Sequence, residues 1–216
     1  MTELPPLVIT ISRQMGSGGA EIGQMLAKRL DWTCLDREIV TQAAELLAAP
    51  VESLSHREES APRFWQTLAS LGSYISRDAY IPPQITYTPT EKDLFAAQSE
   101  VIRKAARDRS LVIIGRCGAS VLAGRPQVLR VFLHADLAFR AQRVSSLYQV
   151  PEATARKMIS QSDSNRAAYH QTFTGESWTD ATRYDLAIHT AQCGLDQTVE
   201  LILAQVRHRG GKVREA

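Results

Sequence analysis

Short apolar runs recur along this chain, separated by longer segments of mixed polarity. Their length and β-branched content predict strands that are buried on both faces. The predicted strands cover residues 7–11, 32–35, 111–114, 128–133 and 184–188. Because helical patterns alternate with these runs, we expect an α/β protein whose parallel sheet is covered on both faces.

Apolar residues at helical spacing follow most of these runs. Four of them between Ile22 and Leu30 would form the buried side of a helix. Asp36 is placed to cap a helix that begins near Arg37, and Pro151 is placed to open another helix as its first residue. The other helices are predicted at residues 37–49, 64–76, 91–109, 135–146 and 195–206.

Three segments depart from the alternation within what we interpret as a single domain, residues 1–216. Residues 50–92 include a polar run and the proline-rich IPPQITYTPT, so we interpret them as an insertion. Residues 162–180 are polar and aromatic without a clean period, which indicates an irregular, flexible flap. Residues 208–216 are basic and contain glycines, so we expect a frayed, solvated end.

Composition excludes several classes of partner. The chain of 216 residues has 25 Lys and Arg against 23 Asp and Glu, a net charge of +2. This balance provides no broad basic surface, so neither a nucleic acid nor a membrane is indicated as a partner. Any affinity for phosphate must come from local arginines and backbone N–H groups.

Cysteine content and the N-terminal residues bear on location. Cys34, Cys117 and Cys193 are few and far apart, which argues against a disulfide framework or a zinc cluster. The N-terminal residues lack the features of a signal peptide, and no apolar run reaches the roughly 20 residues that span a bilayer. We therefore expect a cytoplasmic protein.

A glycine-rich loop, SRQMGSGGAEIG at residues 12–23, lies between the first strand and the first helix. In this setting, backbone N–H groups and the helix dipole can converge on a phosphate. We predict that residues 16–19 bind phosphate, with a tight turn that holds no ligand as the alternative. Compared with the pattern GxxxxGK[ST], Gly19 replaces the lysine, Ala20 replaces the Ser or Thr, and Arg13 replaces the first glycine.

The missing lysine requires another cation if phosphoryl transfer is to be fast. Arg13 is the nearest candidate, and a structural ion pair is its alternative role. Ser12 or Ser17 could orient Mg²⁺ or its waters. Arg116, directly after a predicted strand, could hold a phosphate with its planar fork or form a structural salt bridge.

Charged residues also gather near the predicted flap, namely Arg140, Arg143, Arg156, Asp163 and Arg166. A flexible flap that carries arginines suits phosphoryl transfer, which must neutralise moving charge and exclude water. The alternative is a solvated helix face with ion pairs between residues three or four positions apart.

Together these segments resemble the cytidylate-kinase-like family of P-loop nucleoside monophosphate kinases. The resemblance is carried in order by ITISRQMGSGGAEIGQMLAKRL, LDREIV, VIIGRCGASVL, RVFLHADLAFRAQRV, DSNRAAYHQTFTGESW and YDLAIHT. It is weak only across residues 50–92. It implies a three-layer P-loop kinase fold with a five-stranded parallel sheet, a helical acceptor-binding insertion (about 50–92) and a mobile lid (about 150–180).

The resemblance implies transfer of the ATP γ-phosphoryl group, with Mg²⁺, to CMP or a related small phosphate-bearing acceptor. The residues that we assign to catalysis are Arg13, Arg143, Asp163 and Arg166. Those assigned to nucleotide binding are Gly16, Ser17, Gly18, Gly19, Ala20, Arg140, Arg156 and Thr190, with Ser17 also the candidate metal ligand. Those assigned to the acceptor are Asp36, Arg37, Arg77 and Arg116. The lid aromatics Tyr169, Phe173 and Trp178 could cover a base or form a small apolar core of the lid.

Departures from the family pattern motivate a second hypothesis. Cys117 stands where true cytidylate kinases have an aspartate after the arginine, and Gln42 stands where an arginine is expected. With the loop lysine also missing, the chain could be a non-catalytic nucleotide-binding regulator. The expected partners are a nucleotide or a small phosphorylated acceptor, and a homodimer is left open.

Overall fold

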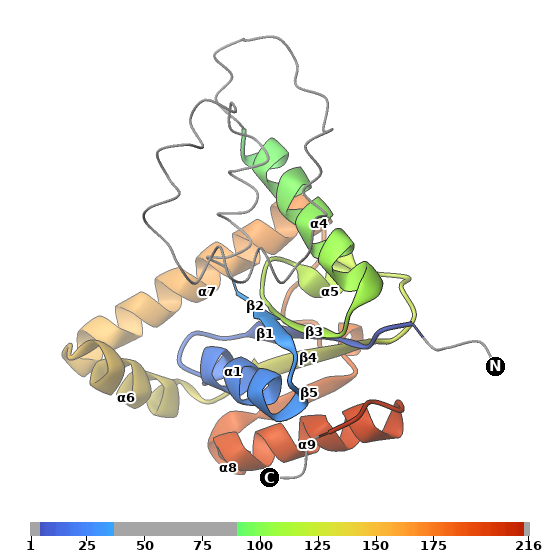
Figure 1. Ribbon diagram of the computed structural model, residues 1–216. Helices are drawn as coiled ribbons and strands as arrows, with labels where there is room; N and C mark the ends of the chain where they lie inside the picture. Colours follow the sequence, from blue (N-terminus) through green and yellow to red (C-terminus); the bar gives the residue numbers. More distant parts are fainter. Residues whose placement is uncertain (1–4, 37–89, 214–216) are drawn as a thin grey trace, which may run out of the picture.

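The computed structural model describes residues 5–36 and 90–213, built around one sheet (Figure 1). The strands are β1 (Val8–Arg13), β2 (Thr33–Leu35), β3 (Leu111–Ile114), β4 (Val128–His134) and β5 (Leu186–His189). Their order is β2-β3-β1-β4-β5, and every neighbouring pair is parallel. The predicted five-stranded parallel sheet is therefore confirmed.

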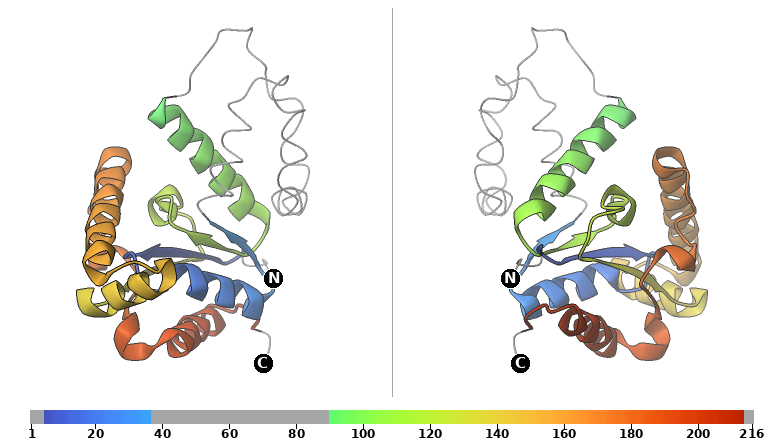
Figure 2. Two further views of the ribbon diagram at one scale, coloured as in Figure 1. Left: turned by 90° about the vertical axis from the view of Figure 1, so that its left-hand side faces the viewer. Right: turned by 90° about the vertical axis from the view of Figure 1, so that its right-hand side faces the viewer.

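Helices cover both faces of this sheet (Figure 2). They are α1 (Gly19–Leu30), α4 (Glu91–Asp108), α5 (Gly118–Val121), α6 (Leu137–Tyr148), α7 (Glu152–Thr174), α8 (Thr190–Cys193) and α9 (Leu195–His208), with a 3₁₀ turn η2 (Ala181–Arg183). Helices α1 and α9 lie on one face, and α4 and α5 on the other. The protein thus has three layers, as predicted.

Alternating side chains of β1 enter two separate cores. Ile9 and Ile11 pack with α1 and α9, whereas Val8 packs with α4 and β3 on the opposite face. A strand that is buried on both faces can consist almost entirely of apolar residues. This explains why the apolar runs alone located the strands to within about two residues.

Helix ends follow local capping chemistry. The Thr90 side chain accepts a hydrogen bond from the Asp93 N–H, and Asp93 bonds back to the Thr90 N–H, so α4 begins with a capping box. Pro151 lies just before α7 rather than within its first turn, because its ψ of 147° is extended. The predicted role of Pro151 as the first helical residue is corrected by one position.

The irregular flap predicted over residues 162–180 is wrong for its first part, because α7 continues as one helix to Thr174. Only Ala155, Ile159 and His170 of this helix are buried. An apolar stripe this narrow leaves no clear helical period in the sequence. Helix α7 packs against α6 through a small cluster that includes Ala155, Ile159 and Val144.

The end of the chain is also better ordered than predicted. A guanidinium nitrogen of Arg209 donates to the Val128 carbonyl oxygen at 2.6 Å, and another lies 3.3 Å from the Asp185 carboxylate. Val213 packs against the core beside α9. Up to residue 213, the predicted frayed tail is therefore corrected to a segment that contacts the body of the protein.

Several predictions concern residues that the structure does not describe. The helices predicted at residues 37–49 and 64–76 lie outside the described residues, as does the insertion apart from its last positions, where α4 begins. Among the helices that are described, none has both the length and the apolar character that crossing a membrane requires.

Candidate active site

The glycine loop links β1 to α1 at the carboxyl edge of the sheet. Gly16 and Gly18 have φ angles of 84° and 81°, in the left-handed region that favours glycine. A Cβ atom at Gly16 would lie 2.8 Å from the carbonyl oxygen of Arg140. The loop therefore requires glycine at this position for both its conformation and its contact with α6.

Hydrogen bonds within the loop hold its shape. The buried Ser17 hydroxyl donates to the Gln14 carbonyl oxygen at 2.8 Å, and the Gln14 N–H donates to the Leu133 carbonyl oxygen at 3.0 Å. No side chain caps α1, whose N-cap is Gly18. Its first N–H groups, including that of the exposed Ala20, are therefore directed at the space where an anion would bind.

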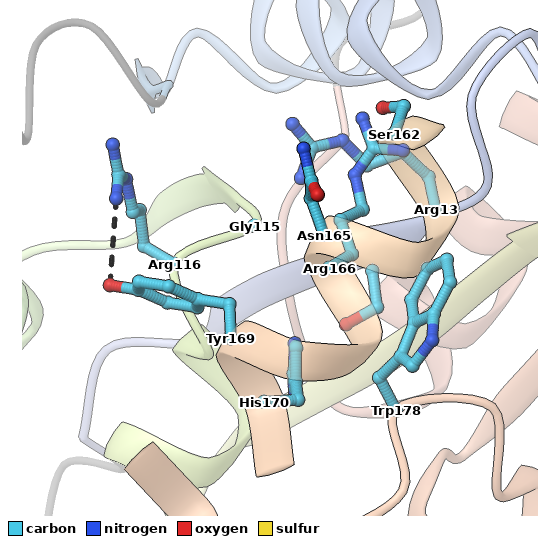
Figure 3. Close-up of a pocket in the computed structure, with 10 residues that line it drawn as sticks. Arg13, Gly115, Arg116, Ser162, Asn165, Arg166, Tyr169, His170 and Trp178 are labelled. Carbon is cyan, nitrogen blue, oxygen red and sulfur yellow. Dashed lines mark hydrogen bonds between the residues drawn. The ribbon is translucent and has the colours of Figure 1, made fainter. Parts of the chain in front are cut away.

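A cavity of about 220 Å³ lies next to this loop (Figure 3). It is lined by Ser12, Arg13, Gly115, Arg116, Ser162, Asn165, Arg166, Tyr169, His170 and Trp178. Arginines from the end of β1, the loop after β3 and helix α7 thus share one cavity. These lining residues include three arginines and no carboxylate.

Arg116 is positioned by its backbone and by helix α7. Its φ of 52° is left-handed, directly after Gly115 at 78°. A guanidinium nitrogen lies 3.5 Å from the Tyr169 hydroxyl oxygen, and the guanidinium carbon is 5.7 Å from the centre of the Tyr169 ring. The Tyr169 hydroxyl in turn donates to the Gln98 side-chain oxygen at 3.1 Å. Arg116 is thereby held over the cavity.

Asp163 connects α7 to the glycine loop. One of its carboxylate oxygens accepts from the Met15 N–H at 2.9 Å and from Arg166 at 3.1 Å. The other accepts from Arg140 at 2.6 Å. Arg140, 8% exposed, also donates to the carbonyl oxygens of Ala135 and Met15. Asp163 and Arg140 therefore connect the glycine loop to helices α6 and α7.

Arg143, Thr190 and Asp36 are not among the residues that line this cavity. Arg143 forms an ion pair with Glu21 in the first turn of α1. Thr190 is fully buried, and its hydroxyl donates to the His134 carbonyl oxygen at 3.3 Å. Asp36 is half-buried after β2. Arg37 and Arg77 lie outside the described residues.

Arg156 is paired along the helix surface. Its guanidinium lies 2.6 Å from the Glu152 carboxylate one turn earlier, with 43% of its side chain exposed. Because such pairs contribute little, Arg156→Ala should change the free energy of unfolding by less than about 0.5 kcal/mol in urea denaturation. If Arg156 binds nucleotide, the same variant should also have a severalfold higher KM for ATP. An unchanged KM would mean that the only role of Arg156 is its ion pair with Glu152.

The sequence analysis did not single out Ser162, Asn165 and His170 as lining residues, and it left the roles of Tyr169 and Trp178 open. Ser162, Asn165 and Tyr169 belong to α7, as does His170, and Trp178 follows that helix. Burial is the main cause that lowers the pKa of His170, with Arg13 and Arg183 adding to the effect against Glu176. Positions 162, 165, 166, 169 and 170 follow helical spacing, so recognising the helix would have grouped most of them.

Comparison with known proteins relates this chain to one family. A family model described as the cytidylate kinase-like family matches residues 8–192. A cytidylate kinase of Halobacterium salinarum is 23% identical over 200 residues, covering 93% of this chain and 89% of that protein. One of Methanopyrus kandleri is 28% identical over 112 residues, covering 48% of this chain and 58% of that protein.

Among solved structures, an uncharacterized protein from Eubacterium ventriosum superimposes with a TM-score of 0.69 at 22% identity. The match covers 93% of this chain and 98% of that chain. At this level of identity the likeness shows a shared fold.

Proposed function

This chain belongs to the cytidylate kinase-like family, and we propose that it transfers the γ-phosphoryl group of ATP to CMP or a related small phosphate-bearing acceptor. The family match and the sheet with helices on both faces confirm the predicted P-loop kinase fold. They also support a kinase-like phosphotransferase. The observation that carries the proposal is the cavity beside the glycine loop, where Arg13, Arg116 and Arg166 come together from three elements.

The glycine loop would hold the donor phosphates. Backbone N–H groups around Gly16–Gly19 and the uncapped start of α1 can donate to phosphate oxygens. The loop is built before any ligand arrives, through the Ser17 and Gln14 hydrogen bonds. A site organised in advance needs little rearrangement as charge develops in the transition state.

The arginines across the cavity would hold the acceptor and the transferring group. Arg116 can present two parallel N–H donors to an acceptor phosphate. Arg166 approaches from α7, so it reaches the cavity from the side of the predicted lid. Because phosphoryl transfer requires little covalent chemistry from the protein, such positioning and charge neutralisation account for most of its catalysis.

Mg²⁺ would be bound mainly by the phosphate oxygens of the nucleotide. No group of three or more His, Cys, Asp or Glu that could hold a metal occurs within the described residues. The side-chain oxygens of the lining residues are the Ser12, Ser162 and Tyr169 hydroxyls and the Asn165 amide. They fit a hydrated Mg²⁺ that keeps phosphate oxygens and waters as ligands. The Ser17 hydroxyl bonds the Gln14 carbonyl oxygen and the Ser12 hydroxyl bonds Tyr184, so either serine would have to exchange a bond within the protein to contact the hydrated ion.

A coupled assay of ADP formation tests the activity. We expect turnover that requires Mg²⁺ and an acceptor, with CMP compared against other nucleoside monophosphates and small phosphorylated metabolites. Gly16→Ala should abolish it, because the new Cβ would meet the Arg140 carbonyl oxygen at 2.8 Å. Gly124→Ala is the matched control: its φ is also positive, at 77°, but no atom lies within 4 Å of the added Cβ.

Absence of turnover with every acceptor, from a folded protein, would contradict the enzyme proposal. It would favour the second function, a nucleotide-binding regulator, for which the glycine at position 19 and the inward Ser17 hydroxyl argue. Calorimetry with ATP and Mg²⁺ separates the cases. Binding without turnover supports the regulator, and absence of binding contradicts both.

A further inference from the structure

The side chain of Arg13 follows the path that a residue at position 19 would otherwise take. A Cβ atom added to Gly19 would lie 2.6 Å from Cγ of Arg13 and 2.7 Å from its Cβ. Both distances are far shorter than a van der Waals contact between carbons. The stem of Arg13 therefore fills the space above the start of α1, and only glycine at position 19 leaves room for it.

A second glycine makes room for the charged end of Arg13. A Cβ atom at Gly115 would lie 2.1 Å from Nη1 of Arg13 and 3.1 Å from its Cζ. Gly115 directly follows β3, and its N–H donates to the Ile11 carbonyl oxygen at 2.9 Å. The guanidinium thus lies against bare backbone at the end of β3, inside the cavity.

The starting point of this path is rigid. Arg13 is the last residue of β1 and pairs in register with Leu133 of β4. Its side chain runs from the sheet, over the first residue of α1, to the loop after β3. The path begins on a strand, crosses the first turn of a helix and ends against the Gly115 backbone directly after β3, so the fold itself places the guanidinium.

We propose that Arg13 supplies the donor-site cation that a P-loop lysine supplies elsewhere, and that Gly19 and Gly115 are the residues that admit it. This inference rests on the proposed function, because it needs a bound phosphate for the guanidinium to contact. A guanidinium keeps its charge at any physiological pH and offers paired donors, so it can replace an ammonium at a polyphosphate. Position 13 and position 19 then behave as one unit, in which only one of them carries a long side chain.

An exchange of the two residues tests this directly. Arg13→Gly together with Gly19→Lys restores the spacing GxxxxGK at residues 13–19. Arg13→Gly alone should lower kcat by on the order of 100-fold, as when one charge-stabilising donor is removed from a site. Gly19→Lys alone should be as harmful, because the new side chain would collide with Arg13. The double variant should recover at least tenfold over either single variant, a non-additivity that independent sites do not show.

Binding of ATP by calorimetry gives a readout that does not depend on knowing the acceptor. The same pattern should appear there: weaker binding in each single variant and recovery in the double variant. If wild-type protein binds ATP but turns over no acceptor, the catalytic proposal fails while this pattern still decides the role of Arg13. If the double variant binds ATP no more tightly than the weaker-binding single variant, the proposal that Arg13 replaces a lysine at position 19 is wrong.

Thermal unfolding guards against a purely structural role. Arg130→Gly, which removes an arginine from the neighbouring strand β4, is the matched control and should leave ATP binding unchanged. If Arg13→Gly lowers the melting temperature but leaves ATP affinity and kcat at wild-type values, Arg13 is a structural residue and the proposal is wrong. Arg13→Lys should keep part of the activity, because a point charge remains on the same path.

Discussion

Asp163→Ala is expected to lower the free energy of unfolding by about 3 kcal/mol, the low end of what breaking a buried ion pair costs. The reason is the Arg140 guanidinium, whose side chain is 9% exposed and would lose its carboxylate partner at 2.6 Å. The Met15 N–H in the glycine loop would lose its acceptor at the same time. Urea unfolding followed by circular dichroism measures the change.

Arg166→Ala is the contrasting variant. Arg166 bonds the same carboxylate at 3.1 Å, but it is 28% exposed and lines the cavity. Its loss should lower the free energy of unfolding by about 1 kcal/mol or less. Because Arg166 lines the cavity and Asp163 does not, Arg166→Ala should lower turnover more than the comparison variant Asp163→Asn. A destabilisation below about 1 kcal/mol in Asp163→Ala would mean that Arg140 finds water or another acceptor, contrary to the ion pair seen here.

The fold could be predicted because each strand appears in the sequence as a short, mostly apolar run. Residues such as Ile9, Val112 and Leu129 are completely buried, so the runs that contain them are mostly apolar and stand out in the sequence. Its place at the carboxyl end of a strand also identified Arg116 as a candidate, since ligands of open parallel sheets bind at that edge. This reasoning needs only chain order and topology.

Helix α7 shows where pattern analysis failed. Asp163, Asn165 and Arg166 are polar because they face a cavity and a loop, not because the segment is irregular. A functional helix face can thus remove the periodicity by which helices are recognised. The same cause hid Ser162 and His170 as lining residues.

The relation between Arg13 and Gly19 could not be predicted for a different reason. The sequence shows an arginine gained and a lysine lost six positions apart, but not that one stem fills the space of the other. That requires the path of the side chain from the end of β1 across α1 to Gly115. Spacing indicates which residues could meet, and only the three-dimensional path shows which exclude each other.

Arg116→Ala is expected to weaken acceptor binding by about 1.5–3 kcal/mol, the usual contribution of a hydrogen bond to a charged group. This corresponds to roughly a 10- to 150-fold higher acceptor KM when chemistry is slower than acceptor release. The KM for ATP should change little, because Arg116 lies after β3 and not in the glycine loop. Steady-state kinetics with each substrate varied in turn provides both values.

Two variants make the result specific. Tyr169→Phe keeps the ring that lies 5.7 Å from the Arg116 guanidinium carbon but removes the hydroxyl at 3.5 Å, so a smaller rise in acceptor KM is expected. Arg183→Ala removes an arginine paired with Glu176 outside the lining of this cavity, and it should leave acceptor KM unchanged. An unchanged acceptor KM in Arg116→Ala would mean that Arg116 does not bind the acceptor and has a structural role, such as its contact with Tyr169. Equal rises in acceptor and ATP KM would instead mean that losing Arg116 disturbs the whole cavity, including the position of α7.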